Sequence, residues 1–183
     1  LTIIVLPTDQ KFPDGCFVED TAVITNEAAI ITNPGDSSRT DETKTIAEVI
    51  SKFKKTERIS LPGTLDGGDI LRVEKHFYIG ISKRTNLEGA KQLATLLSKY
   101  GYTSSQVSVG SLLHLKTGIA YLGKNNFISV KDLTGIPKNS TSIILDPDED
   151  YSANCLRVND FLLIPKGFPK SKKQIVDMGY KVI

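Results

Sequence analysis

Three observations predict an α/β protein built from repeated hairpin–helix–strand units. Four stretches share a polar start, an alternating strand, a short polar turn and a second apolar strand, at residues 20–31, 69–80, 118–130 and 154–164. Apolar residues at helical spacing, followed by a short strand, come after the first two stretches. The 183 residues are 39% hydrophobic and 24% charged, which is typical of one globular domain or two very small ones. We therefore expect small sheets stacked about an axis.

The four predicted hairpins recur at nearly regular spacing. They start at residues 20, 69, 118 and 154, so the intervals are 49, 49 and 36 residues. Each has a polar turn suited to a tight hairpin: Asn26-Glu27, Glu74-Lys75-His76, Lys124-Asn125-Asn126 and Asn159-Asp160. The shorter last interval indicates that one unit is reduced.

Helices and single strands are predicted between the hairpins. The first helix covers residues 46–53, and the second covers 87–100 with Asn86 as its N-cap and Gly101 as its end. Short strands are expected at 58–61 and 106–109. The interval 131–152 shows a strand at 142–145 and no convincing helix, and a capping box starting at Ser171 predicts a third helix.

Both ends of the chain have apolar, strand-like sequences, at residues 1–6 and 179–183. A chain that begins and ends inside strands is typical of a fragment. The alternative is that both terminal strands are simply tied into the fold.

Composition and motifs exclude several classes of protein. With 23 Lys and Arg against 21 Asp and Glu, the charge does not suit a dedicated nucleic-acid binder. No apolar run is long enough for a membrane span, and no signal peptide is recognisable. Two distant cysteines and two separated histidines form no disulfide framework or metal-ligand pattern, and no nucleotide-binding motif is present. We expect a cytoplasmic protein without metal or cofactor that binds neither nucleic acid nor membrane.

Polar residues open each hairpin, where a buried strand end is normally apolar. If the units stack on an axis, these residues face a common centre and form a polar site. They are Glu19 and Asp20, Asp66 and Asp69, His114, and Asn154.

Two acidic motifs among these openings allow two interpretations each. Glu19-Asp20 could hold a cation such as guanidinium, or could lie on a solvated strand end. The turn 66–69 has two glycines between two aspartates. The glycines could allow another part of the molecule to approach the backbone closely, or the segment could be an ordinary turn.

The basic candidates are also ambiguous. His114 lies among leucines and is either a core histidine or a general base, whereas His76 lies at a turn and is expected to be inert. Arg39 and Arg84 each precede a helix at equivalent positions of two units. They could converge on one carboxylate, or be solvated surface residues.

Together these motifs resemble the dimethylarginine dimethylaminohydrolase family of the guanidine-modifying, or pentein, superfamily. The matching segments occur in family order over nearly the whole chain, at residues 6–7, 13–14, 17–20, 38–39, 64–69, 80–86, 113–116 and 153–155. The resemblance implies a five-bladed α/β propeller. Four hairpins then indicate an absent or incomplete blade, with 1–183 as a single catalytic domain truncated at both ends.

The same resemblance implies a hydrolase that converts a methylated arginine to citrulline and a methylamine. In this family a cysteine thiolate attacks the guanidinium carbon, and a histidine assists water in resolving the thiouronium intermediate. Neither Cys16 nor Cys155 matches that nucleophile, so we expect it beyond Ile183 and expect this chain alone to be inactive.

The matching positions carry specific implied roles. His114 is the catalytic histidine, with Asp66 orienting it; Asp14, Glu19 and Asp20 hold the guanidinium; and Arg39 and Arg84 bind the α-carboxylate of a small-molecule substrate. Lys116 stands where arginine deiminases have an acidic residue that holds the unmethylated guanidinium, so the resemblance favours the methylarginine hydrolases and leaves arginine deiminase as the alternative. A third possibility is a non-catalytic pentein that binds arginine-like ligands. The sequence does not predict the oligomeric state.

Overall fold

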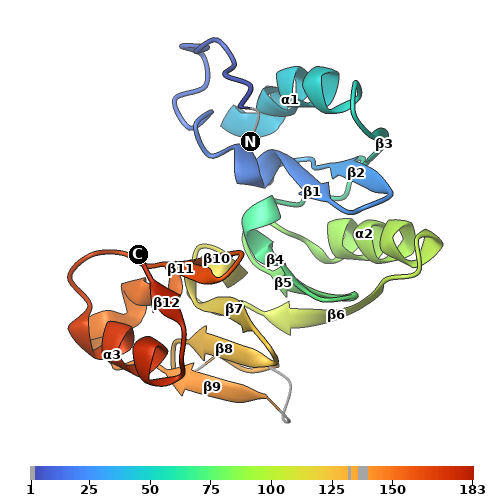
Figure 1. Ribbon diagram of the computed structural model, residues 1–183. Helices are drawn as coiled ribbons and strands as arrows, with labels where there is room; N and C mark the ends of the chain where they lie inside the picture. The colour runs from blue at the N-terminus through green and yellow to red at the C-terminus, as the bar shows by residue number, and fades with distance from the viewer. Residues whose placement is uncertain (1–2, 132, 136–139) are drawn as a thin grey trace.

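The computed structural model describes residues 3–131, 133–135 and 140–183, and within them the chain forms four separate three-stranded sheets (Figure 1). Each sheet is an antiparallel hairpin extended by a third strand that runs parallel to the second strand of the hairpin. The predicted repeated α/β architecture is therefore confirmed.

The strands follow the chain order within each sheet. Their bounds are β1 (Ala22–Ile24), β2 (Ala28–Ile31) and β3 (Lys55–Arg58); β4 (Ile70–Val73), β5 (His76–Ile81) and β6 (Thr103–Ser108); β7 (Ile119–Gly123), β8 (Asn126–Ser129) and β9 (Thr141–Ile144); and β10 (Leu156–Val158), β11 (Phe161–Leu163) and β12 (Lys181–Val182).

Helices connect the second and third strands of three sheets: α1 (Thr43–Ile50), α2 (Leu87–Lys99) and α3 (Pro169–Asp177). Short 3₁₀ helices mark the starts of the four units, and one more lies in the connection between β2 and α1. They are η1 (Val18–Thr21), η2 (Ser37–Glu42), η3 (Gly67–Asp69), η4 (Leu115–Thr117) and η5 (Pro147–Ala153). The predicted cap of α2 is confirmed, because the Asn86 side chain accepts a hydrogen bond from the Gly89 N–H at 2.8 Å.

Several predicted elements differ from the structure. The first helix, α1, ends at Ile50 and not at residue 53, and β6 begins at Thr103 and not at residue 106. β3 lies at 55–58 and not at 58–61, because its parallel pairing with the buried strand β2 ends at Arg58. Described residues 3–6 form no strand, since no described strand pairs with them. The Ser171 capping box is wrong: α3 begins at Pro169, and Glu149 of η5 accepts the Ser171 N–H. Residues 1–2, 132 and 136–139 of the predicted first strand and third interval lie outside the described residues.

Each hydrophobic cluster joins two successive units, which arranges the sheets as a series. Ile30 packs with Phe77 and Leu93 between the first and second units. Two further clusters join the second unit to the third and the third to the fourth, centred on Phe127 and Leu162.

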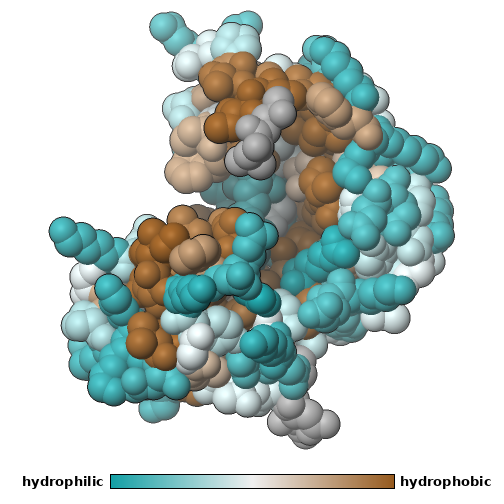
Figure 2. Space-filling model, in the orientation of Figure 1, coloured by the Kyte–Doolittle hydropathy of each residue, from teal (hydrophilic) through white to brown (hydrophobic). Residues whose placement is uncertain are grey.

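The series of units bends into an arc. The first strands β4, β7 and β10 contact one another in turn, and the first and fourth units lie on either side of a hollow (Figures 1 and 2). Because each hairpin starts near this hollow, the residues that open the hairpins are brought to a common region. None of the helices in the described part of the chain combines the length and apolarity needed to cross a membrane.

Candidate functional site

A cavity of about 1140 Å³ lies where the units converge, and it is large enough for an amino-acid-sized ligand. Its walls include the seven residues to which the sequence assigned a catalytic or binding role, and Asn154, which opens the fourth hairpin; Asp69, which opens the second hairpin, lies behind them. The predicted residues are Asp14, Glu19, Asp20, Arg39, Asp66, Arg84 and His114.

The turn at 66–69 passes directly beneath the polar centre, and its glycines make this possible. A Cβ at Gly67 would lie 2.1 Å from the carbonyl oxygen of Glu19, and one at Gly68 would lie 2.8 Å from Cγ of His114. The Gly68 N–H donates to Oδ1 of Asp20 at 2.8 Å. Because glycines have no side chain, Asp20 and His114 can lie this close to the backbone of η3.

His114 lies between two carboxylates. Its Nδ1 is 3.7 Å from Oδ2 of Asp69, and its Nε2 is 3.9 Å from Oδ1 of Asp20. Burial alone would lower the pKa of His114, but the negative charges of Asp69, Asp20 and Asp66 outweigh it and raise the pKa above the ordinary 6.5. The imidazole therefore retains a proton closer to neutral pH than a free histidine does.

Asp66 is a buried carboxylate with one unused oxygen. Its Oδ1 accepts the Gly35 N–H at 2.8 Å, while Oδ2 is buried without a hydrogen-bond partner. Burial raises the pKa of Asp66, and the nearby charge of Asp20 adds to that effect. A cationic group that donates a hydrogen bond to this oxygen would stabilise the ionised form of the carboxylate.

Asp20, Asp66 and His114 offer ligand atoms that all lie within 4.8 Å of one another. This spacing suits a planar organic cation that donates several hydrogen bonds. Oδ2 of Asp20 already binds Arg39, at 2.7 Å, and we assign no metal to this cluster.

Arg39 is buried and fully engaged with the protein. Its guanidinium donates to Asp20 at 2.7 Å and to Glu42 at 2.7 and 3.0 Å, and it also donates to the carbonyls of Asp14 and Phe17. The two carboxylates together outweigh the burial of Arg39 and raise its pKa. These contacts hold the loop before η1 against η2 and fix the direction of Asp20.

The remaining predicted residues lie nearer the rim. Arg84 pairs with Asp36 at 2.7 Å and keeps 27% of its side chain exposed. Glu19 is 67% exposed and pairs with Lys116 at 2.6 Å across the cavity. Glu19 is thus paired at the rim, outside the group formed by Asp20, Asp66 and His114.

Sequence reasoning missed two buried acids. Asp69 was recognised only as a polar opening of the second hairpin, yet it is the carboxylate nearest to Nδ1 of His114. Glu42, which binds Arg39, has no recognisable pattern in the sequence because it lies on a short 3₁₀ segment far from Asp20 in the chain.

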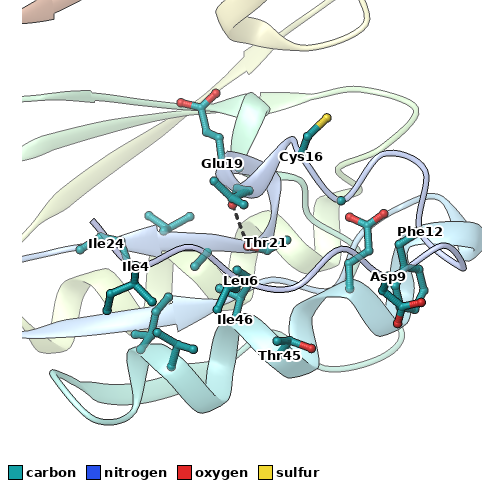
Figure 3. A pocket seen from close by; sticks show the side chains of 18 of the residues that line it. Ile4, Leu6, Asp9, Phe12, Cys16, Glu19, Thr21, Ile24, Thr45 and Ile46 are labelled. Carbon is teal, nitrogen blue, oxygen red and sulfur yellow. Dashed lines mark hydrogen bonds between the residues drawn. The ribbon is translucent and has the colours of Figure 1, made fainter. Parts of the chain in front are cut away.

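The two cysteines differ in environment. Burial raises the pKa of the Cys155 thiol to about 12, so it remains protonated at neutral pH. Cys16 is exposed and borders both this cavity and a second one of about 940 Å³, formed by the N-terminal segment, β1 and α1. Figure 3 shows this second cavity, with Leu6 and Ile46 among its apolar walls.

Comparisons with known proteins agree on one family. The family model described as "Arginine deiminase" matches residues 10–164. Dimethylarginine dimethylaminohydrolases of Pseudomonas aeruginosa and Streptomyces coelicolor are 45% and 32% identical. The alignments cover 99% and 100% of this chain, and 73% and 70% of those enzymes.

Solved structures give the same result. A cysteine-to-serine variant of the Pseudomonas aeruginosa enzyme in complex with citrulline has a TM-score of 0.94 and 44% identity, covering 97% of this chain and 71% of that one. The N-terminal domain of a cyanobacterial arginine dihydrolase has a TM-score of 0.84 at 16% identity, covering 96% of this chain and 70% of that one, which shows a common fold.

Proposed function

The chain belongs to the dimethylarginine dimethylaminohydrolase family, and from that membership we propose that it hydrolyses methylated arginines to citrulline and a methylamine. One observation supports this activity for this chain. Ligand atoms of two carboxylates and one imidazole lie within 4.8 Å of one another, at a cavity large enough for an amino acid. We treat residues 1–183 as parts of one catalytic domain, because all four units border that cavity.

The carboxylate of Asp20 is proposed to hold the substrate guanidinium, and Asp66 is proposed to orient His114. The unpartnered Oδ2 of Asp66 supports this role, because a buried carboxylate is stabilised by a cation that donates hydrogen bonds. Glu19 and Asp14 are proposed to contribute from the rim, where the negative charge of Glu19 is partly satisfied by Lys116.

Arg84 is proposed to bind the α-carboxylate of the substrate. It borders the cavity and is partly exposed, so its guanidinium can reach a ligand. The sequence assigned the same role to Arg39, but the contacts of Arg39 support a different one, in which it holds Asp20 in place.

The proposed reaction has two steps, formation of a covalent thiouronium intermediate and its hydrolysis. A cysteine thiolate, as the family resemblance implies, adds to the guanidinium carbon, and the amine leaves with a proton from His114. His114 then takes a proton from water, which attacks the thiouronium carbon, releases the thiolate and leaves citrulline. The raised pKa of His114 suits the first step, which needs a protonated imidazole. Cys155 is not proposed as the nucleophile, because its thiol has a pKa of about 12.

A citrulline-release assay on the full-length protein tests the proposal. Dimethylarginine and monomethylarginine should yield citrulline, with the amine identified by mass spectrometry, and arginine should react far more slowly. Replacing His114 with alanine should lower turnover by about 10²–10⁴-fold. His76→Ala is the matched control, since His76 lies outside the cavity lining, where it hydrogen-bonds Thr103 and Ser105 and packs edge-on against Tyr78.

Two other outcomes would contradict the proposal. Preferred turnover of arginine would favour an arginine deiminase activity, which the matching family model makes the second candidate. Binding of dimethylarginine without citrulline release would indicate a non-catalytic arginine-binding protein.

A further inference from the structure

Two arginines border the central cavity and take no part in the proposed reaction. Arg72 lies on β4 and Arg157 on β10, and both border the same cavity as His114. We propose that these two arginines form a second binding site of the cavity, for a small polyvalent oxyanion of the phosphate or carboxylate class. This site is separate from the guanidinium site and has the opposite charge.

The two arginines occupy equivalent positions along the cavity wall. Arg72 follows Asp69 by three residues, and Arg157 follows Asn154 by three residues, in the hairpins of the second and fourth units. Three residues of extended chain span about 10 Å. The strands β4, β7 and β10 contact one another in turn, so both arginines lie about this far from the polar residues that open their hairpins.

The same backbone contact orients both guanidinium groups. Nε of Arg72 donates to the carbonyl of Glu74 at 3.0 Å, and Nε of Arg157 donates to the carbonyl of Asn159 at 3.0 Å. Each acceptor begins the turn of its hairpin and has a φ of 55°. The terminal nitrogens of both groups donate no hydrogen bond to the described residues, so they can bind a ligand.

Packing also limits the movement of the two side chains. The guanidinium of Arg72 lies over the rings of Phe77 and Tyr102, with its carbon 5.6 and 5.2 Å from the ring centres. Arg157 lies against β7, where a Cβ at Gly123 would overlap its Nη1. Side chains that are already ordered lose less conformational entropy when a ligand binds.

Neither arginine has a carboxylate partner. Arg39 and Arg84 pair with carboxylates, whereas Arg72 and Arg157 form no ion pair with any of the described residues. Both are exposed to the cavity rather than buried in the core. An oxyanion would supply the missing negative charge, because a planar guanidinium binds carboxylate and phosphate oxygens through two parallel hydrogen bonds.

Two carboxylates of this region are held by tyrosines instead. Glu27 accepts the Tyr102 hydroxyl at 2.9 Å, and Glu74 accepts the Tyr121 hydroxyl at 3.0 Å. Arg157 is close enough to Tyr121 for its charge to oppose the rise in pKa that burial gives this phenol. These hydrogen bonds keep both carboxylates in place, and neither carboxylate completes an ion pair with an arginine.

Calorimetric titration of the full-length protein with inorganic phosphate, and separately with citrate, tests the proposal. At least one of the two anions should bind, and the tighter one identifies the phosphate or the carboxylate class. Arg72→Gln and Arg157→Gln should each weaken that binding by about 10–100-fold, because each removes a charge-assisted contact. The titration needs no substrate, so its result does not depend on the proposed hydrolysis.

Arg58→Gln is the matched control. Arg58 is exposed on β3, outside the lining of both large cavities, and its replacement removes the same charge. It should leave the affinity unchanged. Equal weakening in Arg58→Gln would show a general effect of positive charge and would overturn the proposal, as would the failure of both anions to bind.

Arg84→Gln distinguishes the new site from the proposed substrate site. If Arg84→Gln abolishes binding of the anion while Arg72→Gln and Arg157→Gln bind it like the unmodified protein, the anion occupies the substrate site and the proposal is wrong. Circular dichroism checks that each variant folds. If Arg72→Gln does not fold, Arg157→Gln decides the question, because Arg157 has no ring contact in the described part of the chain.

Discussion

Replacing Arg39 with methionine separates a structural role from a role in substrate binding. Methionine fills a similar volume but leaves the carboxylates of Asp20 and Glu42 without their cation. The Arg39 side chain is 8% exposed, and those of its partners are 10% and 4% exposed, so water cannot replace the lost contacts.

The expected cost follows from this burial. Removing one partner of a buried ion pair typically costs about 3–5 kcal/mol of unfolding free energy. For a chain of this size, one kcal/mol corresponds to about 2–4 °C, so the melting temperature should fall by roughly 6–20 °C. Arg39→Lys should lie in between, because lysine keeps the charge but cannot donate through a planar fork.

Thermal unfolding followed by circular dichroism at pH 7 measures the effect. Arg84→Met is the matched control: Arg84 and Asp36 have side chains that are 27% and 38% exposed, so their pair should contribute less than about 1 kcal/mol. If Arg39→Met melts like Arg84→Met and only raises KM, Arg39 binds substrate and the structural reasoning fails.

Three further predictions concern the polar centre and the thiols. Asp20→Asn should weaken binding of a guanidinium ligand by about 1.5–3 kcal/mol in calorimetric titration; unchanged affinity would remove Asp20 from the ligand site. The folded-state pKa of His114 is raised above 6.5, so its stabilising contribution should be complete below about pH 6.5 and be lost as the pH rises through the folded value. His114→Gln should flatten that part of the melting-temperature profile, and an unaltered profile would contradict the direction of the shift. Finally, Cys16 should react readily with a thiol reagent in the native protein while Cys155 reacts only after unfolding, because Cys16 is exposed and Cys155 has a pKa of about 12; equal native rates would refute this.

The sequence by itself determined the repeated architecture. Hairpins, helix α2 and the order of units follow from local rules, because strand alternation, turn residues and an N-cap such as Asn86 act within a few residues. The polar residues that open the hairpins also predicted a common cavity, and the structure places seven predicted site residues around it.

Local rules failed where pairing or long-range contacts decide. β3 is an edge strand of mostly polar residues whose position is set by β2, and the start of α3 is set by Pro169 together with Glu149 of η5. Residues 3–6 have a strand-like sequence but no described strand to pair with.

Only the tertiary structure decided how charges are distributed inside the site. Arg39 looks like Arg84 in the sequence, but burial and the carboxylate of Glu42 turn it toward Asp20. Likewise, the turn 66–69 has two similar aspartates, and only the folded chain shows that Asp69 faces Nδ1 of His114. The reason is physical: the energy of a charge depends on its burial and on neighbours brought from distant parts of the chain, and neither is encoded in local sequence spacing.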